Sequence, residues 1–192
     1  MPAPNPAALE FLLSRRSRPA RTLTPPVPDR DALRPLLTAA ARSPDHGKLE
    51  PWRFIVLERA ALERLAGLVE RLGPGLGRDA DEIAKARSQY AEGNLAVAVI
   101  EVQKPSATVP AIEQSYSAGA VCLALLNASL AAGWGANWLS GWPVHERAFV
   151  TEALGLAAHE RVAGMIHIGT DTVAPPERPR PDIDAITEWA GE

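Results

Sequence analysis

An apolar run at residues 94–102, NLAVAVIEV, constrains the fold of this chain more than any other stretch. Its β-branched side chains follow one another without the polar alternation of a half-exposed strand, and the run has the length of a strand. We therefore expect a strand that is buried on both faces. Such a strand requires helices on both sides of its sheet, because each apolar face must be covered by another layer.

The longest helix is expected at residues 111–132, closed by Gly133, because glycine suits the residue after a helix. Further helices are expected from Asn5 to about Arg15, from Asp29 or Asp31 to Ser43, over 62–72, within 144–155 and near Trp189. Strands are expected over 52–57, 135–140 and 160–169. These elements lack regular strand-helix-strand spacing, so an α+β fold is favoured over a doubly wound dinucleotide-binding fold.

The length and composition indicate one domain. At 192 residues, the chain can build one sizeable core, so we expect a single domain over residues 1–192. The net charge of -3 offers no broad positive field for nucleic acid or an anionic membrane. The most apolar segment, 118–132, is shorter than the roughly 20 residues of a membrane span. A single cysteine, Cys122, and no recognisable signal peptide make the cytoplasm the expected location.

Familiar metal and hydrolytic motifs fail on their spacing. A zinc protease helix carries a second histidine four residues after the first. Here the residue four positions after His145 is Phe149, and the residue four positions after His159 is Ala163. His167 lies in the expected strand at 160–169 and is predicted to be a structural histidine with satisfied hydrogen bonds. The sequence therefore disfavours zinc and hydrolase chemistry.

The basic cluster SRRSR at residues 14–18 ends the first expected helix and has two interpretations. In the first, three arginines form a solvated helix end that complements the helix dipole, an effect of about 0.3–1 kcal/mol. In the second, the guanidinium groups and Ser17 bind a phosphate through charge-assisted hydrogen bonds. The cluster alone leaves both open.

Several motifs follow one another in a recognisable order. They are RRS at 15–17, ARSPDHGKLEPWRFIVL at 41–57, a long helix running into GWGANWLSG at 133–141, GMIHIGT at 164–170 and ERPRP at 177–181. This order resembles the flavin-dependent nitroreductase family, in particular its compact single-domain NAD(P)H nitroreductases, over nearly the whole chain. The resemblance implies an α+β nitroreductase-like fold, with a mostly antiparallel central sheet flanked by helices, and a homodimer that binds FMN at its interface.

The resemblance also implies which residues bind the cofactor: Arg15, Arg16, Ser17, Arg42, His46, Trp138, Leu139, Ser140 and Arg178. The first three would hold the FMN phosphate and ribityl chain, whereas Arg42 and His46 would reach the flavin from the partner subunit. Residues 138–140 would lie along the flavin, and residues 128–133 would contact the nicotinamide nucleotide. Arg180 rivals Arg178 as a further phosphate ligand. Trp52 is assigned to the core, since a tryptophan at a strand start usually packs there.

The implied activity is hydride transfer from NAD(P)H through FMN to an electron-poor acceptor, such as a nitroaromatic or a quinone, in a ping-pong cycle. The flavin performs this chemistry, so no acid or base residue is required. Arg16 and Arg42 are candidate cations for the flavin pyrimidine edge, because Pro19 stands where some relatives carry a basic residue. Two alternatives stay open: another flavin reaction on the same fold (flavin fragmentation, dehalogenation or desaturation), and a non-enzymatic dimeric interaction protein.

Overall fold

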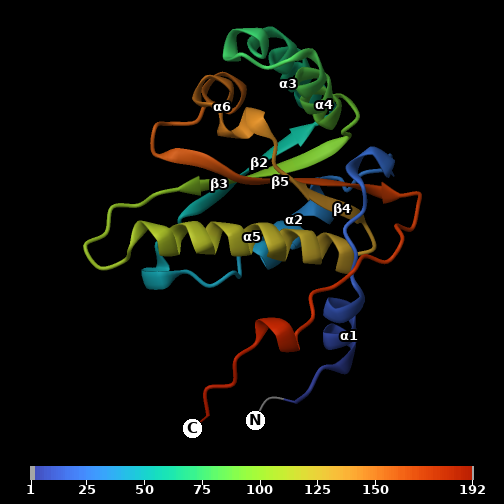
Figure 1. The fold of residues 1–192 in the computed structure, drawn as a ribbon, viewed down its shortest axis with the longest axis vertical. Helices are drawn as coiled ribbons and strands as arrows, with labels where there is room; N and C mark the ends of the chain where they lie inside the picture. Colours follow the sequence, from blue (N-terminus) through green and yellow to red (C-terminus); the bar gives the residue numbers. More distant parts are fainter. Residues whose placement is uncertain (1–2, 192) are drawn as a thin grey trace.

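The computed structural model describes residues 3–191, which form a sheet between two layers of helices (Figure 1). The strands are β1 (Leu23–Thr24), β2 (Trp52–Glu58), β3 (Leu95–Val102), β4 (Gly135–Leu139) and β5 (Glu160–Asp171). β3 lies between β2 and β5, β4 pairs with the opposite edge of β5, and β1 pairs with the end of β5. Every pair is antiparallel, which confirms the predicted α+β class.

Residues 3–191 form six α-helices, and five of them cover the two faces of this sheet. The six are α1 (Pro6–Ser14), α2 (Arg30–Ala40), α3 (Arg59–Leu72), α4 (Ala80–Ala91), α5 (Ala111–Ala131) and α6 (Arg147–Leu154). Helices α3, α4 and α6 pack on one face, and α2 and α5 pack on the other (Figure 1). None of the helices within residues 3–191 has both the length and the apolar character that crossing a bilayer requires.

Strand β3 is buried along its whole length, as the apolar run predicts. Its side chains alternate between the two cores. Val97 and Val99 join the core beneath α2 and α5, whereas Ala98 and Ile100 join the core beneath α3 and α6. Strand β3 therefore contributes side chains to both cores.

Two expectations about local structure are wrong. Helix α4 was not expected, because its sequence, ADEIAKARSQYA, shows little apolar periodicity, and only Ala86 and Tyr90 are buried. Its start is encoded locally instead, by a capping box in which the Asp79 side chain accepts from the Glu82 amide at 2.8 Å. The expected helix near Trp189 is replaced by a 3-10 turn at Asp184–Ile186.

Helix α1 and the C-terminal segment both extend away from the body (Figure 1). Helix α1 buries none of its residues, and Leu9, Leu12 and Leu13 are 59%, 55% and 75% exposed. The C-terminal segment also exposes large apolar side chains, and Trp189 is 89% exposed. Within the described part of a single chain, the apolar side chains of α1 and of the C-terminal segment are therefore largely exposed.

Candidate functional site

The basic segment after α1 is held in place beside β4. The Arg18 amide donates to the Ala136 carbonyl at 2.8 Å, and the Asn137 side-chain amide donates to the Arg18 carbonyl at 2.6 Å. These two bonds attach the segment to the sheet, so residues 15–18 are half-buried instead of forming a frayed helix end.

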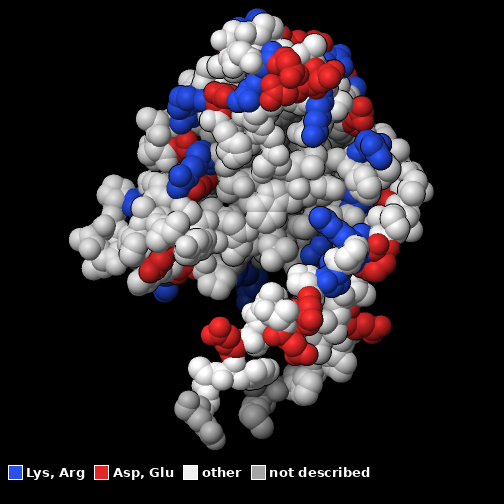
Figure 2. Space-filling view, viewed as in Figure 1, with Lys and Arg blue, Asp and Glu red and all other residues white. Residues whose placement is uncertain are grey.

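The C-terminal segment supplies further charged groups to this cluster. Glu177 pairs with Arg16 at 2.9 Å and with Arg180 at 3.2 Å, and Arg18 pairs with Asp171 at 2.9 Å. Arg178 is exposed, and its backbone amide donates to the Glu177 carboxylate. Figure 2 shows the basic side chains gathered where this segment meets the body. The geometry thus favours Arg180 over Arg178 as a member of the cluster.

Arg15 is the cation of the cluster that lacks a balancing charge. Within residues 3–191 it forms no ion pair, and its buried Nε has no hydrogen-bond partner. Its one side-chain bond is a long one, from Nη2 to the Ser17 hydroxyl at 3.5 Å. Burial, together with the positive charges of Arg180 and Arg16, lowers the pKa of Arg15. A partly buried cation beside other cations favours an anionic ligand.

The arginines line a cavity of about 310 Å³ that also reaches the end of α5. The lining residues are Phe11, Ser14, Arg15, Arg16, Arg18, Leu130, Gly133, Trp134, Gly135 and Asp171. The helix end expected to contact nicotinamide nucleotide therefore lies at this cavity, through Leu130 and Gly133. Arginine forks and a serine hydroxyl are the donors that a phosphate group prefers, so the residues present fit the phosphate end of FMN.

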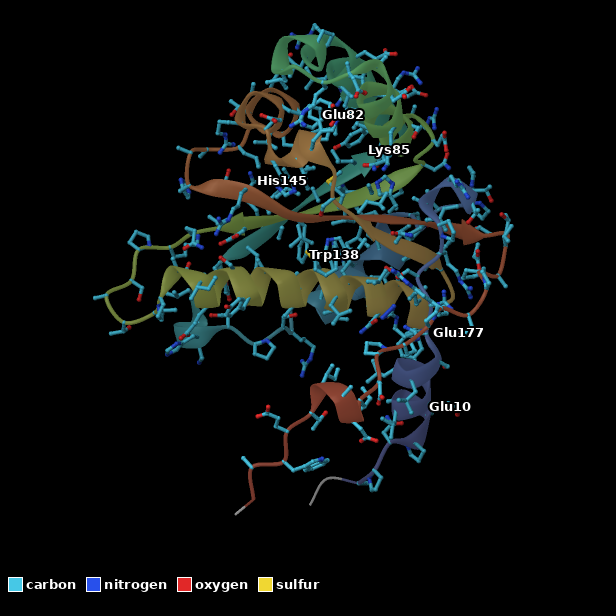
Figure 3. All side chains as sticks on the ribbon, viewed as in Figure 1. Glu10, Glu82, Lys85, Trp138, His145 and Glu177 are labelled. Atoms are coloured by element: carbon cyan, nitrogen blue, oxygen red, sulfur yellow. The ribbon has the colours of Figure 1, made fainter. Side chains whose placement is uncertain are left out.

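The three expected residues of β4 and its end do not share one surface. Trp138 packs over Gly164, where an added Cβ would collide with the indole ring. Leu139 points to the opposite face of the sheet, as strand alternation requires, and Ser140 is exposed beyond the end of the strand. Figure 3 shows Trp138 on the α5 side and Lys85 on the α4 side of the sheet.

A second cavity, of about 420 Å³, opens between α4 and β4 and was not expected. Arg21, Lys85, Gln89, Asn137 and Leu139 are among the residues that line it. Strand alternation in GANWLS could have predicted that Asn137 and Leu139 share a face. Nothing in the sequence pattern located the residues of α4, because that helix was not predicted.

The turn that carries Arg42 and His46 lies at the other end of α5. His46 Nδ1 lies 2.6 Å from Glu113 Oε2 in the first turn of that helix. At 1.5 Å per residue, Glu113 lies about 25 Å along α5 from Leu130, which lines the arginine cavity. One chain therefore does not bring Arg42 and His46 to Arg15.

Trp52 connects this turn to the core through a chain of hydrogen bonds. Its indole nitrogen donates to the Ser117 hydroxyl at 3.1 Å, and that hydroxyl donates to the Pro44 carbonyl at 2.8 Å. The Trp52 ring packs against the α2 and α5 core, which confirms its assignment as a structural residue.

His167 is buried in β5, as expected for a structural histidine, but its hydrogen bonding differs from the expectation. Its Nδ1 has no partner among the described residues, so the prediction of a satisfied ring is wrong. Burial lowers the pKa of His167 to about 4, so the ring is neutral at pH 7.

The chain matches known proteins over most of its length. The model of the "Nitroreductase family" matches residues 12–170. The Escherichia coli (strain K12) protein named "Putative NAD(P)H nitroreductase YdjA" is 35% identical over 163 residues, which cover 85% of this chain and 87% of that protein. A Haemophilus influenzae protein named as an NAD(P)H nitroreductase of the same kind is 34% identical over 164 residues, covering 85% of this chain and 88% of that protein.

Solved structures share the whole fold. A nitroreductase-like family protein from Bacillus cereus has a TM-score of 0.77 at 24% identity and covers 98% of both chains. A Desulfovibrio desulfuricans protein solved in complex with FMN has a TM-score of 0.75 at 21% identity, covering 99% of this chain and 100% of that one. The family match and the two relatives above 30% identity show that this chain belongs to the nitroreductase family of oxidoreductases.

Proposed function

We propose that this protein is an FMN-dependent oxidoreductase that uses NAD(P)H to reduce an electron-poor small molecule, such as a nitroaromatic or a quinone. Bound FMN would supply the chemistry, by accepting a hydride from NAD(P)H and passing it to the acceptor in a ping-pong cycle. The observation that supports this proposal most is the half-buried guanidinium of Arg15 in the arginine cavity, which has no balancing charge and whose buried Nε has no hydrogen-bond partner among the described residues.

Arg15, Arg16 and Ser17 would hold the phosphate, with Arg180 closing the cavity from the C-terminal segment. Glu177 already balances Arg16 and Arg180, so Arg15 would gain most from a phosphate dianion. Arg178 stays a candidate, because its exposed side chain is free to turn toward the cavity when the ligand binds.

The flavin ring would extend from this cavity along β4 toward α4. Leu139 would contact the ring, and Arg21 or Lys85 would stabilise the negative charge that reduction places on its pyrimidine side. These two replace Arg16 as candidate cations there, because Arg16 is paired with Glu177. Ser140, beyond the strand end, would border the ring, whereas Trp138 faces the α5 side of the sheet and would not contact a ring on the α4 side of the same chain.

We further propose that the site is completed in a homodimer. Arg42 and His46 lie far from Arg15 along α5 within one chain, so they could reach the same ligand only from a second copy. The exposed face of α5 supports such an interface, because Ile112, Tyr116 and Leu123 are 53%, 69% and 45% exposed at helical spacing. No nucleic acid or membrane partner is proposed, and the cytoplasm, which supplies NAD(P)H, is the proposed location.

An anaerobic absorption spectrum of the purified protein tests this function. We expect a yellow protein whose flavin band bleaches on addition of NADH or NADPH and returns on addition of a nitroaromatic or a quinone. A colourless protein that ignores added FMN would overturn the proposal and leave the non-enzymatic interaction protein. Bleaching without return by any acceptor would instead indicate another flavin reaction.

A further inference from the structure

One carboxylate oxygen of Glu177 lies among several donors of the arginine cavity. This oxygen, Oε1, is 2.9 Å from Arg16 Nη1 and 3.2 Å from Arg180 Nη2, and it accepts the Arg178 backbone amide at 3.0 Å. Figure 3 shows Glu177 where the C-terminal segment passes the end of α1. Two guanidinium groups and a backbone amide around one oxygen are also the surroundings that proteins give to a phosphate oxygen.

This arrangement leaves hydrogen-bonding capacity unused. Arg16 Nη1 is buried and forms no hydrogen bond within residues 3–191, so its contact with Glu177 is an ion pair alone. The buried Nε of Arg15, in the same cavity, also lacks an acceptor there. An unsatisfied buried donor costs free energy. A phosphate, with three acceptor oxygens, would satisfy more of these donors than the one oxygen of Glu177 does.

The Glu177 carboxylate is charged but loosely held. The Arg178 amide, together with Arg16 and Arg180, lowers its pKa, so the group is ionised at pH 7. Its side chain is 71% exposed and that of Arg180 is 53% exposed, whereas that of Arg16 is only 17% exposed. Exposed ion pairs are weak because water screens them. Glu177 can therefore turn into solvent while Arg16 keeps its place.

We infer that Glu177 is a displaceable counter-ion, whose carboxylate takes the place of a phosphate oxygen until FMN binds. The phosphate would then pair with Arg16 and Arg180, and Glu177 would turn into solvent. This inference rests on the proposed function, since it concerns the phosphate of FMN. It adds that the chain carries a competitor for its own cofactor, which holds the empty cavity together and lowers the affinity for FMN.

Two opposite effects of Glu177 follow. Without a ligand, its charge reduces the repulsion among the arginines, so it stabilises the apoprotein. With FMN, it must either leave or stay beside the phosphate and repel it, and both cost affinity. Removal of this charge should therefore destabilise the apoprotein and tighten FMN. A carboxylate that positioned Arg16 for the phosphate would have the opposite effect on FMN, because its removal would weaken binding.

Glu177→Gln tests the exchange, because it removes the charge and keeps the size of the side chain. We expect the Kd for FMN to fall about fivefold, a modest factor because exposed ion pairs are weak. Riboflavin has no phosphate and displaces nothing, so its Kd should stay the same. Quenching of flavin fluorescence on binding to the apoprotein measures both. Glu188→Gln is the matched control, since it removes the same charge from an exposed residue of the same segment without an ion pair in the described chain.

The outcomes separate the exchange from other roles of the charge. An unchanged or higher Kd for FMN in Glu177→Gln overturns the inference, and so does equal tightening of riboflavin or equal tightening in Glu188→Gln. Glu177→Asp keeps the charge on a side chain one methylene shorter, so its Kd for FMN should lie between those of the other two proteins. A thermal melt of the Glu177→Gln apoprotein should show a lower melting temperature, and a higher one would contradict the stabilising role.

Inorganic phosphate separates this inference from the proposed function. Phosphate should raise the melting temperature of the apoprotein, and the rise should be larger in Glu177→Gln than in the wild type. This comparison needs no flavin. A protein that gives the larger rise but ignores FMN retains the exchange with phosphate and loses the proposed function. Equal rises in the two proteins overturn the exchange.

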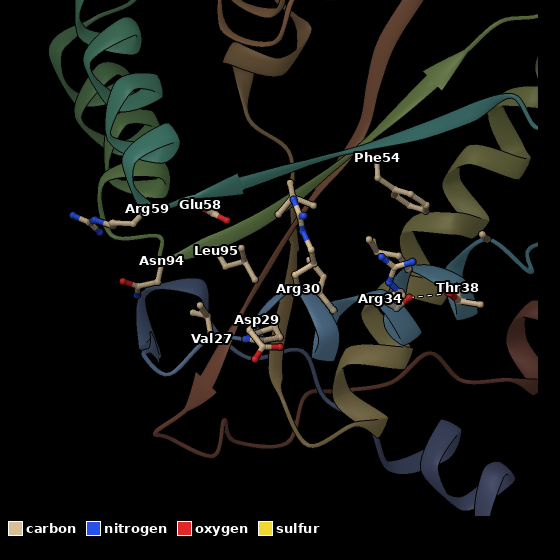
Figure 4. Close-up of a pocket in the computed structure, with 15 residues that line it drawn as sticks. Val27, Asp29, Arg30, Arg34, Thr38, Phe54, Glu58, Arg59, Asn94 and Leu95 are labelled. Atoms are coloured by element: carbon tan, nitrogen blue, oxygen red, sulfur yellow. Dashed lines mark hydrogen bonds between the residues drawn. The ribbon is translucent and has the colours of Figure 1, made fainter.

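A second group of arginines requires a control in the phosphate experiment. Arg30 and Arg34 line a larger cavity of about 900 Å³ between α2 and β2 (Figure 4), and neither forms an ion pair within residues 3–191. Phosphate bound there would also raise the melting temperature. The comparison is therefore repeated with Arg34→Ala in both proteins. The difference caused by Glu177→Gln should persist, and its loss would assign the phosphate effect to the other cavity.

Discussion

Replacement of Arg15 by alanine tests the anion cavity most directly, because two measurements should move in opposite directions. Arg15 is half-buried beside Arg16 and Arg180 and has no carboxylate partner among the described residues. A hydrogen bond to a charged group contributes about 1.5–3 kcal/mol, and a guanidinium can donate two bonds to one phosphate. We therefore expect a loss of about 3 kcal/mol in FMN binding, which is roughly a 100-fold increase in Kd.

The same substitution should not destabilise the protein without FMN. It removes a cation that is buried among like charges, so the melting temperature of the apoprotein should stay the same or rise. Fluorescence titration with FMN and a thermal melt measure the two effects, with Arg64→Ala on α3 as the control for a lost surface arginine. Arg15→Lys should give an intermediate Kd, since it keeps the charge and loses the fork. An FMN Kd within twofold of the wild-type value would refute the reasoning.

Three further changes test other parts of the structure. Arg42→Ala should weaken FMN retention and slow reduction by NAD(P)H, as followed in a stopped-flow spectrometer; unchanged occupancy and rate would remove Arg42 from the site. Gly164→Ala should push Trp138 from its place and lower stability by about 1–3 kcal/mol in urea unfolding, and a neutral result would contradict the packing. Glu160 is bonded by Arg53, which lowers its pKa to about 2, so its stabilising contribution is complete above about pH 4.5 and is lost as the pH falls toward 2. Glu160→Gln should flatten the acid side of a stability-versus-pH curve, and an unchanged acid slope would assign that slope to other carboxylates.

Apolar patterning in the sequence was sufficient to predict β2, β3, β4, β5 and most of the helices, whereas the short strand β1 was not predicted. Strand β3 and helix α5 were predicted because their side chains are apolar along runs of the right length, and burial selects for such runs. Helix α4 was missed because it covers the sheet with only two buried residues, Ala86 and Tyr90. Its capping box was the only local signal, and hydrophobic periodicity does not detect a cap.

Some parts of the candidate site were also predicted from the sequence, and others were not. The arginine cluster, the turn with Arg42 and His46, and the strand end at 138–140 were found in the sequence because their motifs are contiguous. The cavity beside Lys85 and Gln89 was not found, because it combines a helix and a strand that are distant along the chain. Similarly, the place of Arg180 depends on where the C-terminal segment meets the segment after α1, through the Arg16–Glu177 pair, and no local pattern specifies that contact.

The sequence by itself determined the family, the α+β class and which residues are candidate phosphate ligands, because each of these depends on the type and order of neighbouring residues. Only the tertiary structure decided which arginine of the cluster lacks a counter-charge among the described residues and that Trp138 and Leu139 face opposite sides of the sheet. These properties depend on distances between segments far apart in the chain. Such distances are set by packing, which local patterns along the sequence do not encode.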